Sequence, residues 1–410
     1  MTLSSGESVG STVRAARIMA KLTQAQLSKM CAISQSSVSR IESGIHLPTT
    51  PERRALADAL KVPPSMLGLG TEAENGEMSE DDMRRRDLLS ATIVLGLGST
   101  LPGSATAVPA SWDSVLLQQY DASPMSPVQI EASLAAGIQH YADARYTEAA
   151  QAVPDLVSAA ERHARTAPGV ASATLLSRTY VLATAVAVKE RGDIALVTSD
   201  RAVHAAHRSK DPLATAMAAR AQVIVLRQRG HHTQARQVAN AAMNDLVAEP
   251  TARPVVAHIA LETAYGTAQA GRTSDALDLL SHARNLARQG PAVTHWPDHA
   301  GPLTPDQLDR YALCVHHLLG DTRAALQAAN RINVSAMPTG ERRARARHDT
   351  AKLYQDLGEL PTALALLRDH ETEAPQDARR SSLRRMISGM LATSPSLPGL
   401  RQHALLVGAI

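Results

Sequence analysis

Four polar side chains near the N-terminus have the chemistry of groups that read base edges. They share one face of a short predicted helix and are Gln35, Ser36, Ser39 and Arg40. A glutamine amide pairs well with adenine, and the arginine fork pairs with guanine or with phosphate. A helix that presents this face is chemically suited to the major groove of DNA.

Two short helices must position that face. Thr23 and Ser34 stand eleven residues apart, and each can cap a helix start by accepting a hydrogen bond from an orphan backbone N–H group. Apolar residues fall where the two helices would face each other: Leu27, Met30, Ile33, Val38 and Ile41. The pattern predicts a helix, a tight turn and a second helix.

Residues from about Val13 to Leu67 resemble the Xre/Cro family of phage-repressor-like domains, a fold of five helices. The resemblance implies that Gln24 anchors a phosphate and that the next helix reads bases. Where the family commonly has glycine in the turn, this chain has Ala32, and alanine in a left-handed conformation costs about 1 kcal/mol. The predicted DNA-contact set is Arg14, Gln24, Ser34, Gln35, Ser36, Ser39 and Arg40.

Charge favours DNA over the alternative, a protein-interaction module with a solvated helix face. Residues 1–70 hold eight basic and four acidic side chains, a net charge of +4, whereas the whole chain carries only +3. The remaining residues therefore sum to −1. Basic charge concentrated on a small module is what contact with phosphates requires.

The chain of 410 residues is too long for one such module. Aromatic residues make up 2% of it and phenylalanine is absent, so the core must be built from aliphatic side chains and alanine. Cys31 and Cys314 lie in apolar helical contexts and are interpreted as packing residues rather than a disulfide. We divide the chain into a DNA-binding domain over residues 1–70, a linker over 71–111, and a repeat domain over 112–410.

The linker begins with an acidic stretch. Three basic residues follow, Arg84-Arg85-Arg86, and then an apolar segment over 87–101. We interpret 87–101 as a connecting helix that packs on a neighbouring domain or on its own copy across a dimer. The alternative is a twin-arginine export signal, used if translation began at Met78 or Met83. A real signal lies at the N-terminus, and this segment is also too short for a comfortable membrane span.

From about Trp112 onward the sequence repeats a helix, a short turn and a second helix. The turns begin near Tyr146 and then at five glycines, at intervals of 38 to 49 residues: Gly192, Gly230, Gly271, Gly320 and Gly358. A period near 40 indicates a solenoid of helix pairs. The turns resemble those of the tetratricopeptide family, with lengthened units, which implies six pairs coiled into a right-handed superhelix. The predicted fold is all-α: a phage-repressor-like domain followed by an α-solenoid.

Such a superhelix has a concave groove suited to a peptide, a protein segment or a small molecule. Side chains on predicted first helices are placed to line it: Arg178, Arg220, His258, Glu262 and Arg310. The combined architecture resembles the bacterial RRNPP regulators, in which asparagines clamp a peptide. Here Asn240 and Asn244 share a helical face, but on a second helix. The segment from Gly290 to Pro305, with His295 and His299, is expected to overhang the groove.

Motifs for catalysis are missing from the sequence, which lacks a phosphate loop of the Walker type, HExxH, paired CxxC and a nucleophile elbow. The sixteen histidines lack zinc-site spacing, so we expect no metal and no cofactor. The sequence predicts a cytoplasmic, nucleoid-associated transcription regulator that dimerises, binds an inverted-repeat operator in double-stranded DNA, and senses an effector, with no membrane contact. The alternative is a scaffold or adaptor whose repeats bind a protein partner.

Overall fold

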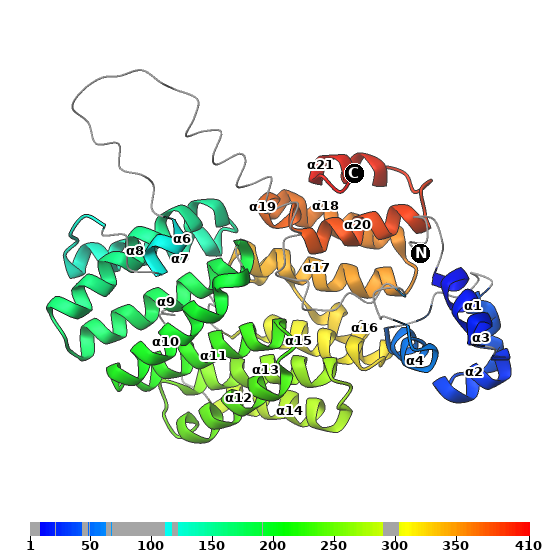
Figure 1. Ribbon diagram of the computed structural model, residues 1–410, viewed down its shortest axis with the longest axis horizontal. Coiled ribbons are helices and arrows are strands. Elements are labelled where there is room, and N and C mark those ends of the chain that lie inside the picture. Colours follow the sequence, from blue (N-terminus) through cyan, green and yellow to red (C-terminus); the bar gives the residue numbers. More distant parts are fainter. Residues whose placement is uncertain are drawn as a thin grey trace, which may run out of the picture.

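A computed structural model describes residues 9–20, 22–42, 48, 50–62, 67, 111–116, 122–190, 192–289 and 303–410. Within these ranges every regular element is a helix, which confirms the all-α fold (Figure 1). Residues 63–66, where the fifth helix of the expected fold would begin, the apolar segment 87–101 and most of the loop from Gly290 to Pro305 lie outside the described residues.

The N-terminal domain begins with four helices: α1 (Val9–Met19), α2 (Gln24–Cys31), α3 (Gln35–Glu42) and α4 (Thr50–Leu60). They pack around an aliphatic core that includes Val13, Leu27, Val38, Ile41 and Leu56, each at most 1% exposed. The prediction that Met30 faces this core is wrong, because its side chain is 55% exposed.

Six helix pairs follow in the described part of the chain, at the places where the repeat predicts them. Their bounds are α7 (Pro127–Ala142) with α8 (Tyr146–Thr166), α9 (Val170–Glu190) with α10 (Ala195–Ser209), α11 (Pro212–Gln228) with α12 (His232–Leu246), α13 (Arg253–Gln269) with α14 (Thr273–Gln289), α15 (Pro305–Leu318) with α16 (Thr322–Arg331), and α17 (Gly340–Asp356) with α18 (Leu360–Glu373). Short helices flank them: α6 (Trp112–Leu116) before, and α19 (Pro375–Ala378), α20 (Ser381–Thr393) and α21 (Leu400–Val407) after.

The turns within the pairs explain the glycine markers. Gly230, Gly271, Gly320 and Gly358 have φ between 73° and 80°, a left-handed conformation that glycine adopts without steric cost. In the first turn Ala144 adopts φ 58° instead.

Alanine-rich first helices form the centre of the repeat domain. In α13, all residues from Val255 to Ala264 are buried. Helix α9 is long and apolar enough to cross a membrane by length and composition, but 78% of its apolar window is buried inside the protein, as in the core helix of a globular domain. Small side chains let these helices approach closely.

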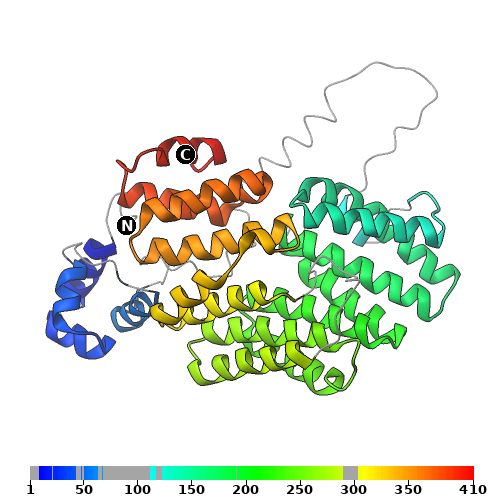
Figure 2. The ribbon, with the colours of Figure 1, turned by 180° about the vertical axis from the view of Figure 1, so that it is seen from behind.

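The row of helix pairs curves so far that helices near its C-terminal end contact helices at its N-terminal end. Helix α17 contacts α7, and α19 contacts α8; Figures 1 and 2 show the C-terminal helices beside the N-terminal repeat in both views. The amide of Gln376 joins the two ends, accepting a hydrogen bond from Thr147 N at 2.9 Å and donating one to Glu148 Oε2 at 2.9 Å.

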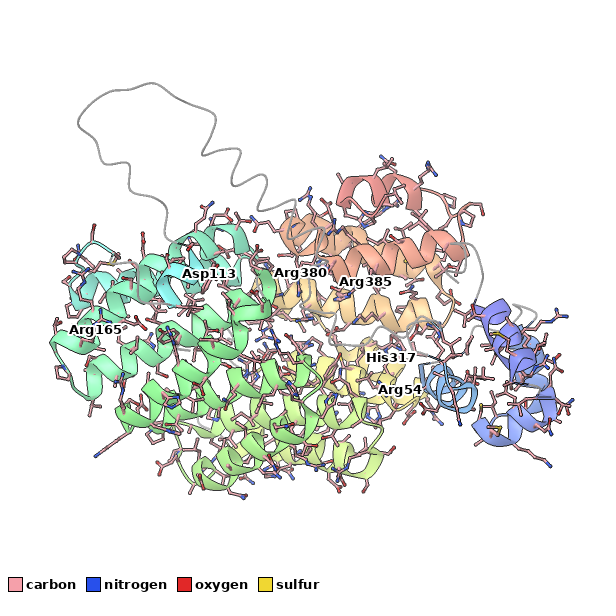
Figure 3. All side chains as sticks on the ribbon, viewed as in Figure 1. Arg54, Asp113, Arg165, His317, Arg380 and Arg385 are labelled. Atoms are coloured by element: carbon pink, nitrogen blue, oxygen red, sulfur yellow. The ribbon has the colours of Figure 1, made fainter. Side chains whose placement is uncertain are left out.

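The N-terminal domain rests on the repeat domain through α4. Arg53 Nη2 lies 3.8 Å from Asp356 Oδ1 at the end of α17, and Asp356 Oδ2 lies 3.0 Å from His317 Nε2 of α15. Figure 3 shows His317 at this boundary, beside α4.

Candidate DNA interface and inner cavity

The turn between α2 and α3 is built as the sequence predicts. Thr23 Oγ1 accepts a hydrogen bond from Gln26 N at 3.1 Å, and the Gln26 side chain accepts one from Thr23 N, which forms a capping box. Ser34 Oγ accepts a hydrogen bond from Ser37 N at 3.0 Å, so Ser34 caps α3. Between the two caps Ala32 has φ 54° and ψ 33°, the left-handed conformation that glycine favours.

A buried ion pair fixes α3 against α1 and α2. Arg17 donates from Nε to Glu42 Oε1 at 2.5 Å and from Nη2 to Glu42 Oε2 at 2.9 Å, and Gln24 Nε2 donates to the same Oε2 at 2.9 Å. Burial opposes ionisation of Glu42, but the hydrogen bonds from Arg17 and Gln24 outweigh it and lower the pKa of this carboxyl. Arg17, on α1, therefore holds the three helices together.

This network engages one N–H of the Gln24 amide, the group to which the resemblance assigns phosphate anchoring. An amide NH₂ group has two donors, so the second remains for a phosphate. The sequence did not indicate the contact with Glu42, because eighteen residues separate the two side chains.

The remaining members of the predicted DNA-contact set are all exposed: Arg14, Ser34, Gln35, Ser36, Ser39 and Arg40. The backbone of the four members on α3 is held by the buried Val38 and Ile41 on the opposite face of that helix. The Ser34 and Ser36 hydroxyls lie 2.8 Å apart and hydrogen-bond to each other. The domain therefore presents a polar helix face on a fixed support.

A large cavity lies inside the curve of the repeat domain. It encloses about 1050 Å³ of empty space, its open mouth included, and first helices α9, α11, α13, α15 and α17 supply most of its wall. Second helices α10, α12, α14, α16 and α18 contribute none of the lining residues.

Three of the predicted groove residues line this cavity: Arg220, Glu262 and Arg310. His258 does not, because it is fully buried within α13, and Arg178 of α9 is also outside the lining. Asn240 and Asn244 stand on the exposed face of α12, a second helix, and are likewise not brought to the cavity.

The sequence did not indicate that α17 has a face on the cavity. Six of its residues line the wall: Glu341, Arg342, Arg345, His348, Asp349 and Lys352. In the sequence this spacing of charges is the same as that of a solvated helix face. The feature of the sequence that could have indicated this cavity face is the position of α17 as the first helix of its pair.

Acidic groups in the wall are held ionised by their neighbours. Burial alone would raise the pKa of Glu341, but the Lys189 ammonium and the Arg342 guanidinium lower it to about 2. Burial likewise opposes ionisation of Glu262, and Arg227 and Arg220 lower its pKa below the usual range. Tyr311 donates a hydrogen bond to Glu262 Oε1 at 2.5 Å.

The described residues contain no group of three or more histidine, cysteine, aspartate or glutamate side chains placed to hold a metal ion. Both cysteines are free and buried, as the packing interpretation predicts. Burial raises the pKa of the Cys31 thiol to about 11.

Comparison with known proteins identifies the N-terminal domain. The family model described as helix-turn-helix matches residues 13–67. Among solved structures, Bacillus thuringiensis PlcR in complex with the peptide PapR7 and DNA aligns with 15% identity and a TM-score of 0.35, over 88% of this chain and 99% of that chain. No curated protein matches the sequence. Residues 13–67 therefore form a helix-turn-helix domain.

Proposed function

We propose that this protein is a sequence-specific DNA-binding transcription regulator whose repeat domain senses an effector. The observation that carries the proposal is the exposed face of α3, with Gln35 and Arg40 directed away from a core that holds the helix rigidly. The match of residues 13–67 to the helix-turn-helix family and the charge of +4 on residues 1–70 support it. In this proposal the protein acts by binding rather than by catalysis.

The proposed contacts divide by their chemistry. Gln35, Ser36, Ser39 and Arg40 read base edges, whereas Arg14, Gln24 and Ser34 anchor phosphates. Two copies of the domain in a dimer would place two α3 helices about one DNA turn apart, so the operator is an inverted repeat. The protein then acts in the cytoplasm, at the nucleoid. Residues 1–70 bind DNA, 71–111 connect, and 112–410 form the sensor.

The boundary between the domains offers a route for coupling. Helix α17 lines the cavity with Arg345 and Lys352, and the same helix ends at Asp356, which contacts Arg53 of α4. An effector that prefers one position of α17 would thereby favour one arrangement of the DNA-binding domain.

The test is selection of genomic DNA fragments by the purified full chain at near-physiological salt. The native protein should enrich a shared inverted repeat, and a Gln35→Ala/Arg40→Ala variant should not. Arg165→Ala is the matched control, because Arg165 is an exposed cation on α8 at the far end of the molecule from the helix-turn-helix domain (Figure 3). It should select the same fragments as the native protein.

The rival function is a scaffold or adaptor in which the repeats bind a protein and the N-terminal domain only adds contacts. Equal fragment recovery by the native protein and the Gln35→Ala/Arg40→Ala variant would favour the rival. Loss of affinity with rising salt, together with sequence preference, would exclude it, because counterion release accompanies phosphate contact.

A further inference from the structure

The inner cavity carries a large excess of positive charge. Its wall holds three acidic residues, Glu262, Glu341 and Asp349, against eight basic ones: Lys189, Arg220, Arg227, Arg310, Arg342, Arg345, Lys352 and Arg380. The excess is five charges. Asp377 pairs with Lys189 and Arg380 just outside this lining, and counting it still leaves an excess of four. Figure 3 shows Arg380 near the centre of the molecule, at the start of α20.

Most of the cations already have anionic partners. Arg310 Nη1 lies 2.6 Å from Asp349 Oδ2, and Lys189 Nζ lies 3.0 Å from Asp377 Oδ1. Arg227 Nη2 lies 3.4 Å from Glu262 Oε2. In each of these pairs a carboxylate already compensates the charge of a cation in the wall.

Arg345 and Lys352 differ from the other cations. Within the described part of the chain neither side chain makes a hydrogen bond or a salt bridge, although both line the cavity. Seven residues separate them, so they lie two turns apart on one face of α17, about 10 Å along the helix axis. His348 stands between them; burial, with Lys352 nearby, holds its pKa well below the usual value, so it adds no charge at neutral pH.

Burial opposes the charge of Arg345, but Asp349, Glu341 and Asp377 outweigh this effect and raise the pKa of its guanidinium. The cations of the wall still outnumber its carboxylates, so they repel one another, and the protein around them strengthens the field inside the cavity. An anion that enters relieves this repulsion. The guanidinium of Arg345 can hold a carboxylate or phosphate by two parallel hydrogen bonds, and the Lys352 ammonium supplies a second point charge.

We propose that this cavity binds a small molecule that carries at least two oxyanion groups, phosphates or carboxylates, held by Arg345 and Lys352. The proposal names the chemical class of the effector and rests on the proposed function for its regulatory role. The binding itself does not depend on DNA.

The experiment is titration calorimetry of the full chain with inorganic pyrophosphate and with citrate, at ionic strength matched with sodium chloride. An Arg345→Gln/Lys352→Gln variant should bind at least tenfold more weakly than the native protein. Arg379→Gln removes an exposed cation next to Arg380 and should bind like the native protein. Arg345→Lys, which keeps the charge but loses the two parallel hydrogen bonds, should bind more weakly than the native protein and more tightly than the double variant.

Folding of the double variant is checked by thermal melting without ligand. Its melting temperature should fall, because Asp349, Glu341 and Asp377 stabilise the Arg345 charge in the folded protein, so the check is that the variant still unfolds in a single cooperative transition. Equal affinity of the native protein and the double variant, or no saturable binding of either anion to the native protein, would overturn the proposal. Preference for pyrophosphate or for citrate decides between phosphate and carboxylate. Binding of an acidic peptide alone would also count against a small oxyanion.

The Gln35→Ala/Arg40→Ala variant separates this proposal from the proposed function. It should bind the anion with native affinity, because the cavity lies in the other domain. Loss of anion binding in this variant would place the anion on the DNA-binding face and contradict the cavity site. Anion binding without operator selection would leave the cavity site in place and remove only its role in transcription.

Discussion

Lys189 Nζ lies 3.0 Å from Asp377 Oδ1 and 3.3 Å from Glu341 Oε1. Asp377 is 188 positions from Lys189 in the chain, and Glu341 is 152 positions from it. The Lys189 side chain is 2% exposed, and its ammonium lies 4.6 Å from the centre of the Tyr146 ring. Removing these charges from water is costly, so the group is stable only while all its members are present. It fastens the end of the helical array to its beginning.

We predict that Lys189→Met destabilises the repeat domain by about 3–5 kcal/mol, because Glu341 and Asp377 would remain buried without their shared cation. Hydrogen exchange measures the effect, and protection should fall in α7, α17 and α19. Lys210→Met, at an exposed position, serves as the control. A loss smaller than 1 kcal/mol would show that the closure does not depend on this ion pair.

The Arg17–Glu42 pair predicts how the helix-turn-helix domain responds to acid. The folded pKa of Glu42 is lowered, so its contribution to stability is present above the unfolded pKa of about 4.3 and is lost as pH falls through the folded pKa. Glu42→Gln should cost about 2 kcal/mol at neutral pH, since Arg17 would lose its charged partner.

Hydrogen exchange of peptides from 24–42 at a series of pH values measures this effect. In the native protein, protection should fall as pH drops below about 4.3, and Glu42→Gln should remove that part of the dependence. Asp58→Asn, at an exposed position on α4, should leave it unchanged. Identical acid profiles for the native protein and Glu42→Gln would contradict the assignment.

Ala32→Gly should stabilise the helix-turn-helix domain by about 1 kcal/mol, because Ala32 occupies the left-handed region at φ 54°. The measurement is the melting transition of this domain in the full chain. Ala15→Gly lies in the middle of α1 and should have the opposite sign, with a loss of about 1 kcal/mol. A destabilised Ala32→Gly variant would mean that the methyl group contributes more through packing than it costs in backbone strain.

Much of the local structure of this protein is predictable from its residues alone. Thr23 and Ser34 cap their helices as expected, and left-handed glycines mark four of the six helix pairs, because caps and left-handed turns depend on residues a few positions apart. The exposed face of α3 was also predictable, since helical periodicity separates Gln35 and Arg40 from Val38 and Ile41.

Which charges become buried depends on how the helices pack. Glu42 meets Arg17 and Gln24 across three helices, and no local pattern specifies that meeting. The charged residues of α17 have the periodicity of a solvated face, yet the curvature of the whole array places Arg345 and Lys352 in the wall of a cavity. Curvature is the sum of packing angles between successive helix pairs, so it depends on contacts that the sequence of any one helix does not contain.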